Sequence, residues 1–188
     1  MGQPHARVEG GHFRKQDVTG NADNRGMGEA LRISGPPIGV GLVFDVSMWP
    51  LVVITLPPVT TPDDIEYMQR CYEHVFASPV RHALIVDTAP IVRVPDATLR
   101  RQMKAFEDSR RPIIQEKNIG SAIIIQNTLV RGGYTALRWI SPQPAPNKAF
   151  ATVGDAARWC VRGIEEDGQV VPIAAYTLAG LASRAAAG

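Results

Sequence analysis

Residues 83–90 of this 188-residue chain have the sequence ALIVDTAP, and this segment gives the clearest indication of the fold. Its first four residues are all apolar, and an aspartate follows them directly. A strand without polar alternation is typical of a position buried on both faces, as in the middle of a parallel sheet. The Asp-Thr-Ala-Pro sequence after it indicates a turn. We therefore expect a central parallel strand here, with helices packed against the sheet.

Upstream of this strand, two β-type segments lie at residues 42–46 and 51–56. Only Ser-Met-Trp-Pro separates them, which favours an antiparallel hairpin. The sequence TPDD at residues 61–64 then predicts a helix start, because threonine caps the first turn and proline and aspartate suit it. Apolar residues recur at helical spacing from residue 65 to residue 76, so this helix has one buried face.

Downstream, a second helical stripe follows Asp96 and contains Pro112, which predicts a kinked helix or two consecutive helices over residues 96–114. Further segments predict a strand at 121–126, a helix at 129–140, a loop at 141–146, an edge strand at 148–151 and a helix after Thr152. The fold class is therefore α/β. We expect a mixed sheet of about five strands, an antiparallel hairpin and then parallel strands, with four to five helices.

Composition limits the class of protein. With 45% hydrophobic and 20% charged residues, the chain can bury a core. We expect a flexible leader at residues 1–37, one α/β domain at 38–168 and an Ala/Leu-rich helix or tail at 169–188. No signal peptide or membrane span is recognisable, so a cytoplasmic location without membrane insertion is expected. Cys71 and Cys160 are then interpreted as buried thiols rather than a disulfide or a metal site.

The charge balance and the motifs argue against several activities. A formal net charge of +2 is too even for binding driven by phosphate neutralisation, so no nucleic acid partner is expected. The chain has no phosphate-binding loop, no metal-ligand spacing and no nucleophile motif, so we predict neither an enzyme nor a cofactor or metal. His82, at the start of a strand, is interpreted as an edge residue. Asp87 follows a buried strand, where ligands collect in α/β sheets, although capping of the next turn is the simpler interpretation.

Basic residues gather around the second helical stripe. One interpretation is an anion or phospholipid headgroup site, and the other is a solvated helix face offset by Glu107 and Asp108. The residues concerned are Arg93, Arg100, Arg101, Lys104, Arg110 and Arg111. Trp49 lies at the predicted hairpin tip, where it would anchor a partner if exposed and would otherwise fold back over the hairpin.

Three local patterns between residues 44 and about 166 resemble the STAS and SpoIIAA-like superfamily, the fold of bacterial anti-sigma-factor antagonists. VVITL at 52–56, with a loop and a capped helix after it, is similar to the second strand and first helix of that family. ALIVD at 83–87 is similar to its central strand, which ends in aspartate. FATVGDAARW at 150–159 resembles the SpoIIAA-like ending, in which a phenylalanine strand leads into a helix with an alanine pair and a tryptophan.

The resemblance implies a regulatory role without catalysis. Antagonists of this family bind a partner kinase or switch protein and are controlled by phosphorylation at the start of the helix after the central strand. Their Asp-Ser-Ser-Gly-Leu motif is similar to residues 96–99, DATL, but the glycine is absent. An ungapped count places Ala97 at the acceptor position, and a shift by one places Thr98 there. In the alternative interpretation Asp96 is the helix cap and Thr98 an ordinary first-turn residue.

Two hypotheses follow from the sequence. The first is a regulatory or scaffolding module that contacts a regulatory kinase, a switch protein or a scaffold, with a homodimer as one form. Its expected interaction surface comprises Asp87, Asp96, Thr98, Arg100, Arg101, Lys104 and Trp49. The second is a binder of a small lipid or other apolar ligand, in a pocket between the helix around residues 106–114 and the Ala-rich tail.

Overall fold

The computed structural model describes residues 35–126 and 144–181 and contains a five-stranded sheet in the order β1-β2-β3-β4-β5. Its strands are β1 (Val43–Met48), β2 (Leu51–Thr55), β3 (His82–Asp87), β4 (Asn118–Ile124) and β5 (Asn147–Phe150). The first two pair antiparallel, and every later pair is parallel. The predicted mixed sheet is therefore confirmed, and β3 is its central strand.

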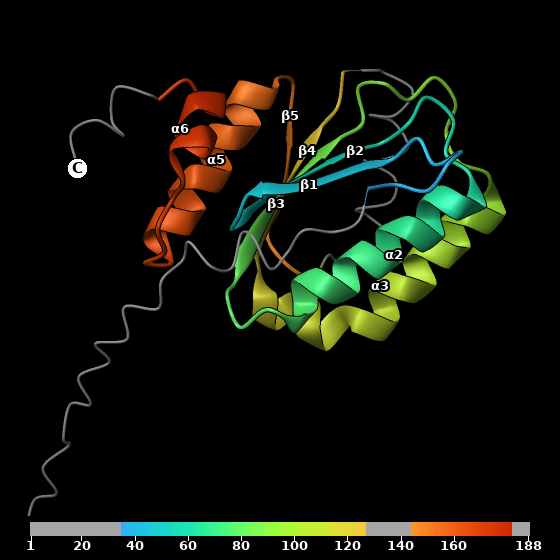
Figure 1. Cartoon of the computed structure of the whole chain (residues 1–188), viewed down its shortest axis with the longest axis horizontal. Helices are drawn as coiled ribbons and strands as arrows, with labels where there is room; N and C mark the ends of the chain where they lie inside the picture. Colours follow the sequence, from blue (N-terminus) through green and yellow to red (C-terminus); the bar gives the residue numbers. More distant parts are fainter. Residues whose placement is uncertain (1–34, 127–143, 182–188) are drawn as a thin grey trace, which may run out of the picture.

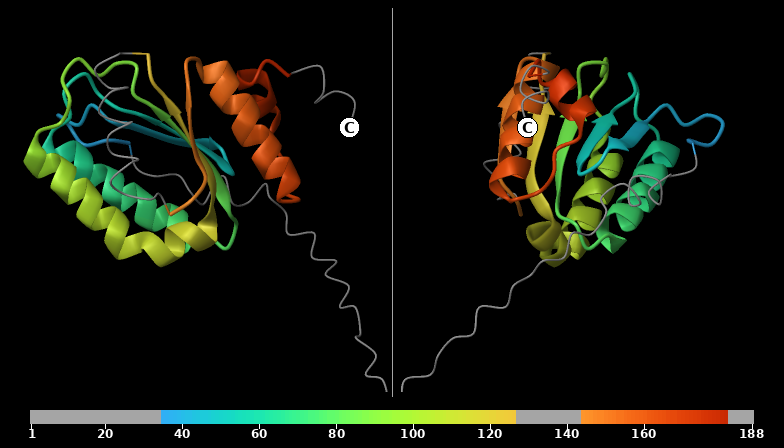
Figure 2. Two further views of the ribbon diagram at one scale, coloured as in Figure 1. Left: turned by 180° about the vertical axis from the view of Figure 1, so that it is seen from behind. Right: turned by 60° about the vertical axis from the view of Figure 1, so that its left-hand side comes forward.

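Helices cover both faces of the sheet (Figure 1). On one face lie α2 (Pro62–Ala77) and α3 (Ala97–Lys117), which pack side by side. On the other face α5 (Val153–Glu166) packs against β3 and β4, and α6 (Ile173–Leu178) packs against α5. Figure 2 shows the sheet as the middle of these three layers. The four helices of the described residues agree with the predicted α/β class.

Short polar side chains begin the three longer helices, as the sequence rules require. Thr61 and Asp64 form a reciprocal capping box at α2, Asp96 caps α3 and Thr152 caps α5. Each side chain accepts a hydrogen bond from an amide that has no partner within its own helix. These residues therefore set where the helices begin.

Some predicted bounds were wrong. α3 continues through Pro112 to Lys117 as one helix, because Pro112 lies on its exposed side, so the alternative of two consecutive helices does not hold. β4 begins at Asn118 rather than at residue 121, because pairing with β3 overrides a polar start. The predicted helix at 129–140 and the first half of the loop at 141–146 lie outside the described residues.

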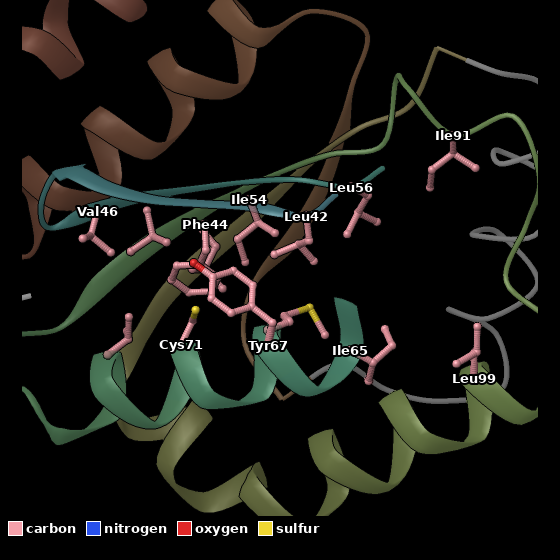
Figure 3. Close-up of a cluster of buried hydrophobic side chains, with 14 of the residues drawn as sticks. Leu42, Phe44, Val46, Ile54, Leu56, Ile65, Tyr67, Cys71, Ile91 and Leu99 are labelled. Carbon is pink, nitrogen blue, oxygen red and sulfur yellow. The ribbon is translucent and has the colours of Figure 1, made fainter. Parts of the chain in front are cut away.

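Two separate hydrophobic cores stabilise the molecule, one on each face of the sheet. The core beneath α2 holds aliphatic and aromatic side chains of β1, β2 and α2, among them Phe44, Ile54 and Tyr67 (Figure 3). The core beneath α5 is rich in small residues such as Ala122, Ala156 and Ala157. Each core contains one free, buried cysteine.

None of the described helices is both long and apolar enough to cross a membrane. The predicted division into leader, domain and tail stays a prediction, since residues 1–34 and 182–188 are outside the described range.

Candidate functional site

The N-terminal end of α3 holds most of the residues expected in an interaction surface. Asp96 caps the helix, and its Oδ1 accepts hydrogen bonds from the amides of Thr98 at 2.8 Å and Leu99 at 2.9 Å. The bond from Leu99, more than the one from Thr98, lowers the pKa of Asp96. Thr98 is exposed, and the Nη2 of Arg101 lies 3.4 Å from its hydroxyl oxygen. The capping interpretation of Asp96 therefore holds, and the hydroxyl of Thr98 still faces solvent.

Three exposed arginines surround this helix start and form no salt bridge among the described side chains. Arg100 donates to the carbonyl of Pro95 at 2.6 Å, and Arg101 donates to the carbonyl of Ala97 at 3.2 Å. Arg93 lies near enough for its charge, with that of Arg100, to lower the pKa of Asp96. These arginines thus keep most of their charge available to an external anion.

The remaining cations of α3 are neutralised. Lys104 and Arg111 both pair with Asp108, at 2.7 Å and 3.0 Å, and these two partners lower the pKa of its carboxyl. Arg110 pairs with Glu73 of α2 at 2.7 Å. A solvated face with internal charge compensation therefore describes α3 from Lys104 onward, and the expected place of Lys104 in the interaction surface stays a prediction.

Exposed apolar residues adjoin the free arginines. Val92 is 69% exposed and Val59 is 43% exposed. An isolated parallel bridge joins Val59 to Arg93, and the amide of Val92 donates to the carbonyl of Pro58 at 3.0 Å. Two loops from different parts of the chain are thus held together at the edge of the sheet where β2 and β3 end. We call Val59, Val92, Arg93, Arg100 and Arg101 the basic edge.

Asp87 and His82 do not form a pair. They lie at opposite ends of β3, about 16 Å apart at the usual rise of a strand. The Oδ1 of Asp87 accepts a hydrogen bond from the amide of Ala89 at 2.9 Å, which is the turn-capping interpretation. The structure therefore does not bring these two side chains together in one site.

Trp49 was wrongly placed in the interaction surface. Its side chain is only 5% exposed, because the indole folds back into the core under α2 and stacks on the imidazole of His82 with ring centroids 5.9 Å apart. His82 was also misjudged as an edge residue. It begins the central strand and is completely buried, since neighbours on both sides and α2 cover it.

A chamber of about 250 Å³ lies between the sheet, α2 and α3. Tyr72 and Phe76 of α2, Phe106 of α3 and His82 of β3 contribute to its walls. The hypothesis of an apolar ligand placed such a pocket between α3 and the C-terminal tail. That location is wrong, because α6 packs on α5 across the sheet from α3.

The chamber has two polar groups that hydrogen bonding within the described residues leaves unsatisfied. Neither ring nitrogen of His82 has a partner there, nor does the Oε1 of Glu107. Burial, with smaller effects of the nearby charges of Arg81 and Lys117, lowers the pKa of His82 to about 4. Burial raises the pKa of Glu107 against the opposing charges of Lys104 and Arg111. At neutral pH the imidazole is therefore uncharged.

Asp64 is a further buried polar residue, and sequence analysis assigned it only to the helix start. Its side chain is 1% exposed and accepts hydrogen bonds from the amides of Gly41 at 2.8 Å, Leu42 at 3.0 Å and Thr61 at 2.8 Å. Burial alone would raise the pKa of Asp64, but these bonds and one from the Thr61 hydroxyl lower it. Asp64 therefore joins the entry of β1 to α2 and has a structural role.

No group of three or more acidic, histidine or cysteine side chains in residues 35–126 and 144–181 is arranged to hold a metal ion.

The five-stranded mixed sheet between two helical layers places the chain in the α/β class. A solved structure identifies the fold within that class: the chain has a SpoIIAA-like fold. The similar structure is an uncharacterized protein of the DUF3478 family from Shewanella loihica PV-4, described as having that fold. The two are 17% identical with a TM-score of 0.50, over 68% of this chain and 98% of the other. No protein-family model and no curated protein matches the sequence.

Proposed function

We propose that this protein is a non-catalytic regulatory or scaffolding module that binds an acidic segment of a protein partner at the basic edge. The observation that carries the proposal is the backbone bridge between exposed Val59 and exposed Arg93, beside further exposed arginines that form no salt bridge among the described residues. Arginine and apolar side chains together are typical of the centre of an interface. A regulatory kinase, a switch protein or a scaffold, as well as a second copy of the chain, would present such a segment.

Thr98 gives this surface a means of control. A phosphate on its exposed hydroxyl would lie near the amides at the start of α3 and within reach of Arg101, which favours the charge. The carboxylate of Asp96 already occupies two of those amides and would be repelled. Phosphorylation would therefore neutralise the arginines and weaken binding of an acidic partner.

Affinity capture from cells of the source organism tests the proposal. The bait is the full chain, with Arg100→Glu and Thr98→Glu as variants that reverse or offset the charge of the basic edge. Arg110→Glu is the matched control, because Arg110 is on the same helix but is paired with Glu73. We expect the captured partner to be lost with the first two variants and retained with the control. Identical capture by all three variants would remove the basic edge from consideration.

The chamber favours a second candidate function, the binding of a small, mainly apolar molecule. Its volume of about 250 Å³ and its aromatic walls agree with the general form of small-molecule sites, which are largely apolar with a few polar groups. The two candidate functions use different surfaces, so a single chain can perform both.

A further inference from the structure

The size of the chamber limits what it can hold. A dry apolar cavity of about 150 Å³ is enough for benzene, so about 250 Å³ suits a molecule of about ten non-hydrogen atoms. This volume cannot contain the whole extended acyl chain of a membrane lipid. The size therefore indicates a compact molecule, such as two fused rings or one ring with a short substituent.

The walls favour an aromatic ligand. Tyr72 forms ring contacts with Phe76 at 5.5 Å and with Phe106 at 5.9 Å between centroids, and Phe76 contacts the imidazole of His82 at 6.2 Å. Each of these four rings contributes to the lining of the chamber. Offset and edge-to-face contacts with a further ring would extend this cluster at favourable distances.

His82 determines which polar group the ligand would carry. The side chain is fully buried, lines the chamber and has two ring nitrogens with no partner among the described residues. A buried polar group without a hydrogen bond is costly. A neutral imidazole offers one donor and one acceptor, and a hydroxyl group can both accept and donate. An uncharged hydroxyl therefore matches His82 better than an ion does.

The charged groups around His82 are engaged with other residues, and Asn118 and Ser121, which also line the chamber, hydrogen-bond to each other at 2.9 Å. Arg81 is engaged with Asp167 and with the carbonyl of Glu116 at 3.0 Å, and Lys117 pairs with the carboxylate of Glu116 at 3.1 Å. On the other wall the Oε1 of Glu107 lacks a partner in the described residues. A carboxylate ligand would meet this acidic group, so a neutral ligand is favoured over an anionic one.

We propose that the chamber binds a small, uncharged aromatic molecule with a hydroxyl group, which hydrogen-bonds to His82. This inference rests on the second candidate function and names its ligand class. It is independent of the basic edge, which lies outside the walls of the chamber.

A pair of isosteric probes tests the proposal on the full chain at pH 7. The first is 2-naphthol, and the second is 2-methylnaphthalene, in which a methyl group replaces the hydroxyl. We expect saturable binding of both, with 2-naphthol bound about tenfold more tightly, as one well-placed hydrogen bond allows. The side-chain NMR signals of His82 should shift on saturation with 2-naphthol. Probe fluorescence or calorimetry gives the affinities, and 2-naphthoate serves as the anionic comparison.

Substitution of His82 tests whether this side chain is the source of the tighter binding of 2-naphthol. His82→Phe should lower the affinity for 2-naphthol about tenfold and change that for 2-methylnaphthalene by less than about twofold. His74→Phe is the matched control, because His74 is exposed on α2 outside the chamber, and it should change neither. If His82→Phe does not fold, the comparison of the two probes on the unmodified chain, with the NMR shift of His82, decides.

The possible results distinguish the assignment of a hydroxyl ligand from the existence of a small-molecule site. Equal affinity for the two probes, or tighter binding of 2-naphthoate, would overturn the hydroxyl assignment and leave a small-molecule site in place. Absence of saturable binding by every probe would overturn the second candidate function as well.

Discussion

The two faces of the sheet are packed to very different degrees. Under α5, the glycine at position 120 lies so close to the indole of Trp159 that an added Cβ would be 2.5 Å from its Cη2 atom. A Cβ added at Gly163 would likewise lie 3.2 Å from the Cγ2 atom of Ile119. Under α2 and α3, the same sheet borders a chamber of about 250 Å³. Since protein interiors are normally close-packed, the difference indicates that α5 lies close against the sheet, whereas the space available to a ligand lies on the side of α2 and α3.

The residues used on each face explain this difference. Small residues such as Ala122 and Ala156 let α5 approach the strands closely. Large aromatic side chains such as Tyr72 and Phe106 hold α2 and α3 farther from β3 and β4 and leave space between them. Burial raises the pKa of Tyr72, so its phenol stays protonated in this setting. We call this side of the sheet, which borders the chamber, the loose face; the side chain of Asp64 makes polar contacts there with the amides before β1 and α2.

The largest expected effect concerns the carboxylate that fixes α2. Asp64→Ala removes the acceptor of the Gly41, Leu42 and Thr61 amides, which leaves buried donors without partners. We expect the free energy of unfolding to fall by about 4 kcal/mol, measured by urea denaturation. Asp63→Ala is the matched control, because Asp63 is the exposed neighbour in the same first turn. Equal losses in the two variants would contradict the role given to Asp64.

The second effect compares the two faces on one strand. Gly120→Val places a branched side chain against Trp159, and we expect it to lower the free energy of unfolding by about 3 kcal/mol. Ile123→Phe enlarges a half-buried side chain that lines the chamber, and we expect a change within about 1 kcal/mol because space is available. Similar losses in both variants, measured by urea denaturation, would show that the faces are equally tight.

Local sequence rules predicted the framework well. The run at residues 83–86, the hairpin and the caps Thr61, Asp96 and Thr152 all depend on neighbours within a few positions. The resemblance to the SpoIIAA-like fold depended on the same local patterns and is confirmed at the level of fold. The interaction role inferred with it stays a proposal, because fold alone does not determine function.

The chamber was only partly accessible to sequence analysis. The apolar-ligand hypothesis placed a pocket between the helix around residues 106–114 and the C-terminal tail. That helix does border the chamber, but the other walls come from α2 and the sheet, which strand pairing and helix packing bring together. Glu107 was interpreted as a compensating surface charge, since a single position on an amphipathic helix does not reveal how deeply it is buried. His82 and Trp49 were misplaced for the same reason, since the stacking between them joins positions 33 residues apart, as their residue numbers show.

The smallest of these effects is the pH dependence that His82 introduces. Burial first, then the charges of Arg81 and Lys117, lower its pKa to about 4 in the folded protein, against 6.5 for an ordinary histidine. The unfolded chain therefore binds a proton more readily. The contribution of His82 to stability is complete above pH 6.5 and is lost as the pH falls toward 4.

This linkage predicts a loss of about 2 kcal/mol in the free energy of unfolding between pH 7 and pH 5 from His82 alone. Urea denaturation at pH 7 and at pH 5 measures the free energy of unfolding of the unmodified chain and of each variant. His82→Phe should remove this loss of about 2 kcal/mol from the pH dependence of the free energy of unfolding. His74→Phe, at an exposed position of α2, should leave that pH dependence unchanged. An equal slope in both variants would mean that the imidazole on the loose face is already hydrated, and the chamber would then offer a ligand no unsatisfied nitrogen.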